Sequence, residues 1–191
     1  MCGIAGYIGK KEGLPTVANN LRKLEYRGYD SAGVAFFSTR IARLRPTRGA
    51  SATRMRPHEL RVRVIKAVGK LDNLERFILG EKSSPATAVI GHTRWATHGV
   101  PNEVNAHPHY DCKKEIFLVH NGIIENYQEL KTELLEKRHR FRSQTDTEVL
   151  VHLIEEYGFE PAFKKVVGAY AVAAIFASEP QKLYVARLGS P

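Results

Sequence analysis

Cysteine is scarce in this sequence, whose 191 residues contain only Cys2 and Cys112. Two cysteines cannot build the disulfide framework of a small secreted domain, and they fit a reducing compartment in which thiols stay free. The sequence also lacks any run of 18 or more apolar residues and the basic and apolar segments of a signal peptide. We therefore expect a cytoplasmic protein that does not cross a membrane, with either thiol open to chemistry.

Acidic residues are nearly absent from one segment. Between Arg40 and Lys66, nine basic residues accompany the single acid Glu59, so this stretch carries +8 of the net charge of +9. Residues 38–60 follow neither a strand nor a helix period, which predicts a mobile insertion in the connection between two strands. One alternative is an arginine-rich arm that binds nucleic acid, although the aromatic residues that would stack on bases are missing. Another alternative is that residues 38–60 come from a mistranslated or misassembled stretch of reading frame.

Apolar residues make up 43% of the chain, enough for the core of one domain spanning residues 1–191. Their periodicity predicts strands at 3–8, 32–37, 61–66, 88–93, 115–119, 170–177 and 182–187. Helices are predicted between the first two strands and at 71–79, 126–137 and 147–157. Because strands and helices do not alternate strictly, the pattern favours an α+β fold of layered antiparallel sheets covered by helices.

Cys2 follows the initiator methionine directly, a position that by itself suits any small residue. Removal of Met1 would give Cys2 a free α-amine of pKa about 8 beside a thiol of pKa about 8.5. One residue would then hold both a nucleophile and the base that takes its proton, so no separate histidine would be needed. Retained Met1 would lock this nitrogen in a peptide bond and abolish the mechanism.

Three segments carry a family resemblance. Residues 1–6 (MCGIAG) resemble the opening of the class II glutamine amidotransferases, whose catalytic residue is an N-terminal cysteine. Residues 24–33 (LEYRGYDSAG) and 91–99 (GHTRWATHG) are similar to the glutaminase domain of the glutamine:fructose-6-phosphate aminotransferases within that class. The resemblance covers nearly the whole chain apart from the arginine-rich segment. It implies an N-terminal-nucleophile hydrolase fold, an αββα sandwich of two antiparallel sheets, with Cys2 on a central strand.

The resemblance also implies a role for particular residues. Cys2 is the nucleophile, and Asn121 with Gly122 forms the oxyanion hole, which suits two neutral donors close to a developing negative charge. Arg94 binds the substrate α-carboxylate, for which a planar guanidinium is well shaped. Asp146 binds the α-ammonium. The remaining substrate-binding residues are Arg27 in the nucleophile pocket and Trp95, Thr97 and His98 on a loop that closes over glutamine.

Each of these residues also has a simpler interpretation. Asn121-Gly122 follows the strand predicted to end near Val119 and is a common turn pair. Asp146 lies in 145–148 (TDTE), where Thr145 and Glu148 have the spacing of a helix capping box. Five histidines between His92 and His120 lack metal-site spacing, so we expect loop histidines without a metal, and we expect no cofactor. Cys112, among charged neighbours, is expected to be an exposed residue without a role.

The function that the resemblance implies is hydrolysis of L-glutamine to glutamate and ammonia through a Cys2 thioester. The ammonia would convert fructose 6-phosphate to glucosamine 6-phosphate on a sugar isomerase domain that this chain lacks, in an enzyme expected to be a homo-oligomer. The chain also ends before the family's glutaminase domain would, which predicts a C-terminally incomplete domain. Another class II enzyme such as an amidophosphoribosyltransferase, or a catalytically inactive glutaminase-like fragment, is the alternative.

Overall fold

The computed structural model describes residues 2–40, 59–85, 87–96 and 99–190. Within these ranges the elements are β1 Gly3–Ile8, α1 Gly13–Leu24, the 3-10 helix η1 Glu25–Arg27, β2 Ser31–Arg40, β3 Glu59–Val68, α2 Leu71–Ile78, β4 Ala88–Arg94, β5 His109–Tyr110, β6 Ile116–Ile124, α3 Tyr127–Glu136, α4 Thr147–Tyr157, α5 Phe159–Phe163, β7 Gly168–Phe176 and β8 Tyr184–Leu188. None of the helices in these ranges has both the length and the apolar character needed to span a membrane.

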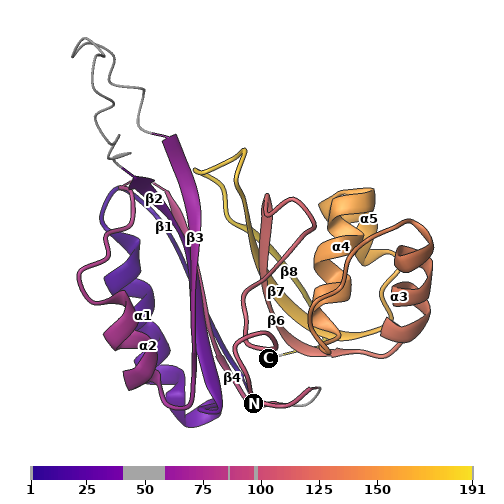
Figure 1. The fold of residues 1–191 in the computed structure, drawn as a ribbon, viewed down its shortest axis with the longest axis horizontal. Helices are drawn as coiled ribbons and strands as arrows, with labels where there is room; N and C mark the ends of the chain where they lie inside the picture. Colours follow the sequence, from indigo (N-terminus) through magenta and orange to yellow (C-terminus); the bar gives the residue numbers. More distant parts are fainter. Residues whose placement is uncertain (1, 41–58, 86, 97–98, 191) are drawn as a thin grey trace, which may run out of the picture.

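The strands form two antiparallel sheets, in the orders β1-β4-β2-β3 and β5-β6-β7-β8. Figure 1 shows the sheets facing one another, with α1 and α2 outside the first sheet and α3, α4 and α5 outside the second. This order of layers, helix, sheet, sheet, helix, is the predicted αββα sandwich. Alternation along the strands explains it, because a strand between two layers sends successive side chains to opposite faces and both faces must be apolar.

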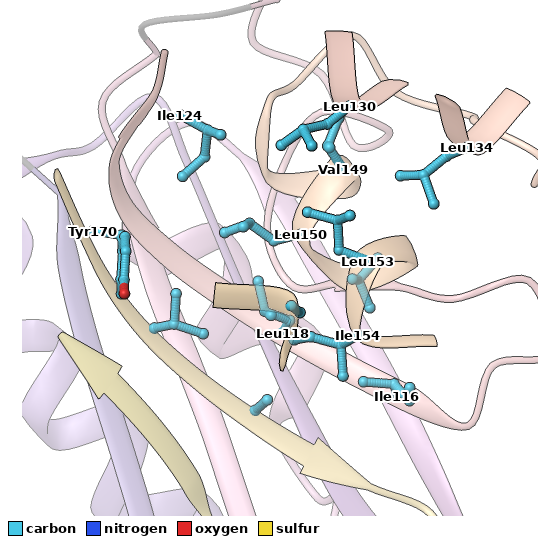
Figure 2. Close-up of a cluster of buried hydrophobic side chains, with 14 residues drawn as sticks. Ile116, Leu118, Ile124, Leu130, Leu134, Val149, Leu150, Leu153, Ile154 and Tyr170 are labelled. Atoms are coloured by element: carbon cyan, nitrogen blue, oxygen red, sulfur yellow. The ribbon is translucent and has the colours of Figure 1, made fainter. Parts of the chain in front are cut away.

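Three clusters of buried side chains hold the layers together. The cluster between the sheets includes Phe37, Ile90 and Phe117, and the cluster beneath α1 and α2 includes Leu21, Val34 and Leu74. The third lies between the second sheet and its helices. Figure 2 shows Leu150 and Leu153 of α4 in this cluster, with Leu118 of β6 beside them. Burial of each such side chain stabilises the fold by about 1.5–3 kcal/mol.

The arginine-rich segment joins two paired strands. β2 and β3 are antiparallel neighbours whose register runs from Ser31 opposite Val68 to Arg40 opposite Glu59. Residues 38–60 were predicted to be a mobile insertion, but β2 and β3 extend into both ends of this range. Residues 41–58, which contain most of its arginines, lie outside the described residues.

Two positions differ from their sequence-based expectation. Cys2 directly precedes β1, which pairs only with β4 and lies at the edge of the described sheet rather than at its centre. Asn121 and Gly122 do not follow a strand. They lie inside β6, which continues to Ile124, and they pair with Ala171 and Tyr170 of β7. The prediction missed this because an Asn-Gly pair that follows a polar residue, His120, resembles a turn.

Candidate active site

The Cys2 thiol lies against the end of β4. Gly3 is opposite Thr93 in the β1–β4 register, and the backbone N–H of Trp95 donates to Cys2 Sγ over 3.2 Å. Burial raises the pKa of the Cys2 thiol, although the hydrogen bond from Trp95 acts in the opposite direction. The thiol is therefore protonated at neutral pH, and attack by its sulfur requires a base to remove the proton.

Asn121 joins the second sheet to the nucleophile. Its Nδ2 donates to the Cys2 carbonyl oxygen over 3.1 Å, and its Oδ1 lies 2.9 Å from Nε2 of His92. Burial lowers the pKa of His92 to about 3, so this histidine is neutral and its Nε2–H is the donor to the asparagine. The hydrogen bond fixes the orientation of the amide, with its NH2 group directed toward Cys2.

The backbone of Gly122 has a conformation and surroundings that only glycine fits. Its φ is +125°, and a Cβ at this position would lie 2.0 Å from the carbonyl oxygen of Ala169. Both observations exclude larger residues. The close approach of β7 therefore explains the glycine without reference to a ligand, and it also presents the Asn121–Gly122 backbone in a fixed position beside Cys2.

Arg94 is buried at the end of β4. One of its guanidinium nitrogens, Nη2, donates to the carbonyl oxygen of Gly99 over 3.2 Å, which spans the loop that follows the strand. Burial lowers the pKa of Arg94, and the negative charges of Asp30 and Asp146, and of Cys2 when it is a thiolate, oppose this shift. These interactions place the predicted nucleophile and both predicted charge-recognition residues in one electrostatic neighbourhood.

Asp146 is buried at the start of α4, where its Oδ2 accepts the backbone N–H of Ile124 over 3.0 Å. The predicted capping box is wrong. Asp146, not Thr145, is the N-cap residue of α4, and its side chain makes no capping hydrogen bond. The Glu148 carboxylate instead accepts backbone N–H groups of Arg142 and Ser143, which precede the helix by several residues. Asp146 nevertheless has a structural role, because its carboxylate joins the end of β6 to the start of α4.

The other predicted substrate-binding residues are brought together only in part. Trp95 is 49% exposed, and its ring meets that of Tyr29 edge-on at 5.6 Å between centroids. Arg27 is half-buried and donates through Nε to the hydroxyl of its neighbour Tyr26 over 3.3 Å. Its recorded side-chain contact is thus local and does not reach Cys2. Thr97 and His98 lie outside the described residues.

Sequence reasoning missed two residues that hold the site in shape. Asp30 accepts the backbone N–H of Ala96 through Oδ2 and the Ser31 hydroxyl through Oδ1, so it anchors the loop that begins at Trp95. His92 orients Asn121. Both lie in the two longer motifs that carry the family resemblance, which was the available signal. A single sequence does not reveal which motif residues touch a ligand and which support those that do.

The predicted loop histidines are mostly buried. His92, His107, His109 and His120 lie inside the molecule, and the rings of His92 and His107 stack at 4.1 Å between centroids. Burial lowers the pKa of His120 to about 4 and those of His107 and His109 well below the usual value, so all are neutral. They form hydrogen bonds behind Asn121, such as His120 Nδ1 with Thr147 Oγ1 at 3.0 Å. The predicted loop position is correct for His107, which lies between β4 and β5, and wrong for His92, His109 and His120, which lie in β4, β5 and β6.

Comparison with known proteins decides the family. Residues 80–189, more than half of the chain, match the glutamine amidotransferase domain. The chain belongs to this glutamine amidotransferase family. Glutamine–fructose-6-phosphate aminotransferases (isomerizing) are similar to the whole amidotransferase chain, with 46% identity over 200 residues in Pyrococcus horikoshii, 49% over 200 in Thermococcus kodakarensis and 43% over 199 in Thermotoga maritima. The chain spans about 30% of the length of these curated relatives.

Two solved structures share the fold of this amidotransferase domain. One is the glutamine phosphoribosylpyrophosphate amidotransferase from B. subtilis, with TM-score 0.68 and 24% identity, covering 93% of this chain and 35% of its own. The other is the allosteric regulatory enzyme of purine biosynthesis, with TM-score 0.72 and 23% identity, covering 98% and 37%. The predicted N-terminal-nucleophile sandwich is confirmed. At this level of identity the likeness extends to the fold alone.

Proposed function

We propose that the chain hydrolyses L-glutamine to glutamate and ammonia, with Cys2 as the nucleophile. The contact between Asn121 and Cys2 carries this proposal. A strand of the second sheet places an amide donor 3.1 Å from the Cys2 carbonyl oxygen, although the two residues are 119 positions apart in the sequence. The amide is oriented from behind by His92, so its donors are fixed before a substrate arrives, as electrostatic stabilisation of an oxyanion requires.

The reaction begins with removal of Met1, which frees the α-amine of Cys2. That amine takes the thiol proton, and Sγ attacks the carboxamide carbon of glutamine. The negative charge that develops on the carbonyl oxygen is stabilised by Asn121 Nδ2–H and the backbone N–H of Gly122. Return of the proton to the leaving nitrogen releases ammonia and leaves a γ-glutamyl thioester. Water, deprotonated by the same amine, then hydrolyses the thioester to glutamate and restores the thiol.

Two buried charges recognise the substrate as a free amino acid. Arg94 donates two parallel hydrogen bonds to the α-carboxylate, and Asp146 accepts from the α-ammonium. A peptide-bound glutamine has neither charge, so Arg94 and Asp146 would have no opposite charge of the substrate to bind, and burial makes such a loss costly. Arg27, Trp95, Thr97 and His98 complete the pocket in this proposal, with Trp95 and its loop closing over glutamine and excluding water.

The ammonia has a destination in the proposed whole enzyme. The similar proteins are named as fructose-6-phosphate aminotransferases and are more than three times as long as this chain. We assign this chain to the ammonia-supplying part of such an enzyme, with glucosamine 6-phosphate as the final product. The whole enzyme is expected in the cytoplasm, where the Cys2 thiol stays reduced, and as a homo-oligomer.

The test is a glutaminase assay on the 191-residue chain, with intact mass measured on the same sample. The chain lacking Met1 should release glutamate from glutamine, and Cys2→Ala should release none above background. A glutamine analogue with an electrophilic γ-carbon should add one label, at Cys2. Equal glutamate release by both proteins, or labelling at Cys112, would refute the assignment. A processed chain that takes the label but shows no turnover would favour the inactive glutaminase-like alternative.

A further inference from the structure

A second cluster of potential metal ligands lies outside the proposed active site. It consists of Cys112 after β5, His139 after α3, and His152 with Glu155 on α4. One ligand atom from each residue lies within 4.8 Å of all the others. Cys112 is half-buried, so the expectation that it is exposed is wrong, and its backbone N–H donates to Glu155 Oε2. The metal expectation considered only the histidines from 92 to 120 and therefore missed His139 and His152.

Four of the six distances between these ligand atoms are close to the edges of a small tetrahedron, and all six lie within 4.8 Å. Cys112 Sγ lies 3.7 Å from Nδ1 of His139 and 3.7 Å from Nδ1 of His152. Glu155 Oε2 lies 3.1 Å and 3.0 Å from the same two nitrogens. A tetrahedral zinc ion with ordinary bond lengths would give edges of about 3.6 Å between sulfur and nitrogen and about 3.4 Å between nitrogen and oxygen. The four observed edges agree with these values within a few tenths of an ångström.

The surroundings also resemble those of a structural metal site. His139 directs its other ring nitrogen, Nε2, at Glu156 Oε2 over 3.3 Å, as metal-bound imidazoles do when a carboxylate fixes the ring. The backbone N–H of Arg140 donates to Cys112 Sγ over 3.4 Å, an interaction that stabilises a thiolate. A divalent ion bound by one thiolate, one carboxylate and two neutral imidazoles gives a neutral group, which is compatible with its burial.

Sequence spacing hides this cluster. His152 and Glu155 are three residues apart on α4 and share one face of the helix, but Cys112 and His139 come from two separate loops. The three segments meet because the turn between β5 and β6 and the end of α3 both pack against α4. A ligand to all three would tie the helical layer to the second sheet.

We propose that Cys112, His139, His152 and Glu155 form a structural Zn²⁺ site that joins the β5–β6 turn, the end of α3 and helix α4. All four positions are protein ligands, so the ion has no open position for a substrate and acts on stability. The site is separate from Cys2 and does not depend on the proposed glutaminase function, because metal content is measured without reference to turnover.

The first experiment measures zinc in the purified 191-residue chain after gel filtration. We expect one equivalent per chain, and Co²⁺ in its place should show the absorption of a tetrahedral ion with a thiolate-to-cobalt band. Cys112→Ser should lose the thiolate band and most of the metal. Cys2→Ser changes the other thiol and should keep both. Equal loss in the two serine variants, or loss in Cys2→Ser alone, would overturn the proposed site.

A second variant separates loss of metal binding from a folding defect, which Cys112→Ser alone could not do. Glu156→Gln leaves all four ligands in place and should weaken zinc binding by about 10- to 100-fold, while the chain without metal melts as the unmodified chain does. Chelation should lower the melting temperature of the unmodified chain and leave that of Cys112→Ser unchanged. Less than a tenth of an equivalent of zinc, with melting unaffected by added zinc or chelator, would show that the four side chains form only a hydrogen-bonded network.

Discussion

Nε2 of His92 lies 2.9 Å from Oδ1 of Asn121, and this one contact determines which way the asparagine amide faces. His92 is fully buried and, with its pKa lowered to about 3 by burial, remains a neutral donor across the working pH range. The proposed oxyanion donor, Asn121, is thus oriented by a histidine in the opposite sheet. Glutaminase activity should therefore be sensitive to a side chain that does not touch glutamine.

Replacement of His92 by Ala should lower kcat for glutamine hydrolysis by about 10- to 100-fold, because a misplaced catalytic group costs rate rather than ground-state affinity. KM should change little. His92→Gln retains an N–H donor and should recover part of the loss, which separates positioning from a simple packing defect. Steady-state kinetics give kcat and KM for both variants, and thermal melts give their stability. Equal activity of the two variants at equal stability would exclude a positioning role.

Asn121→Ala should cost about 10²- to 10³-fold in kcat, the usual loss for one oxyanion-hole donor. Asn121→Asp should be at least as impaired, because a carboxylate of the same shape repels the oxyanion. Asn73→Ala is a matched control, since Asn73 of α2 donates to the Val68 carbonyl oxygen on β3, at the other edge of the first sheet from β1. Single-turnover measurement of thioester formation would locate the defect. A normal rate of thioester formation in Asn121→Ala would contradict the assignment.

Gly28 marks a point where two chain segments nearly touch. A Cβ at Gly28 would lie 2.7 Å from the carbonyl carbon of Arg94 and 2.9 Å from the backbone nitrogen of Trp95. Gly28→Ala should therefore displace the donor to Cys2 Sγ and raise KM for glutamine, with a loss of about 1–3 kcal/mol in stability. Gly80→Ala is the control. Its positive φ costs about 1 kcal/mol, but open space surrounds it, so kinetics should stay normal.

The layers of this fold could be predicted because each element carries a clear period. Strands predicted at 3–8 and 88–93 correspond to Gly3–Ile8 and Ala88–Arg94, and the helix predicted at 147–157 is α4 itself. The shortest elements, η1, β5 and α5, escaped because two to five residues contain less than two periods. β6 was predicted too short because His120, Asn121 and Gly122 interrupt its apolar run before Ile123 and Ile124.

Only some residues of the candidate site could be predicted from the sequence. Cys2, Arg94 and Asn121 could be named because their motifs resemble a family and their chemistry is self-explanatory. The role of His92 could not be predicted, because His92 acts by orienting Asn121, which is 29 residues away and on another sheet. The cluster around Cys112 was hidden for the same reason: three segments converge on it, and no local spacing records their meeting. Tertiary contacts between distant segments have no periodic trace in one sequence.

The buried charge of Asp146 should set specificity for a free amino acid. Asp146→Asn keeps an oxygen that accepts the Ile124 N–H, but it removes the partner of the substrate ammonium. KM for glutamine should rise about 10-fold or more, in line with the loss of a charge-assisted hydrogen bond. Asp111→Asn provides the control, because Asp111 is also buried and accepts backbone N–H groups from Glu115 and Ile116. A similar KM in both variants would refute the role of Asp146.

The buried histidines should make the chain sensitive to mild acid. His92 and His120 have pKa values of about 3 and 4 in the folded chain, against 6.5 for the free side chain, so below about pH 6.5 the unfolded state binds protons that the folded state refuses. The free energy of unfolding should therefore fall as the pH decreases to about 4, by up to about 1.4 kcal/mol per pH unit for each histidine. Glu148, with a pKa of about 2, loses its contribution only below about pH 4.5, so it adds little to this window. Urea unfolding across the range measures the slope, and His92→Gln should reduce it by close to one proton. An unchanged slope would mean that His92 is already protonated in the fold, and that its hydrogen bond to Asn121 joins an imidazolium rather than a neutral ring.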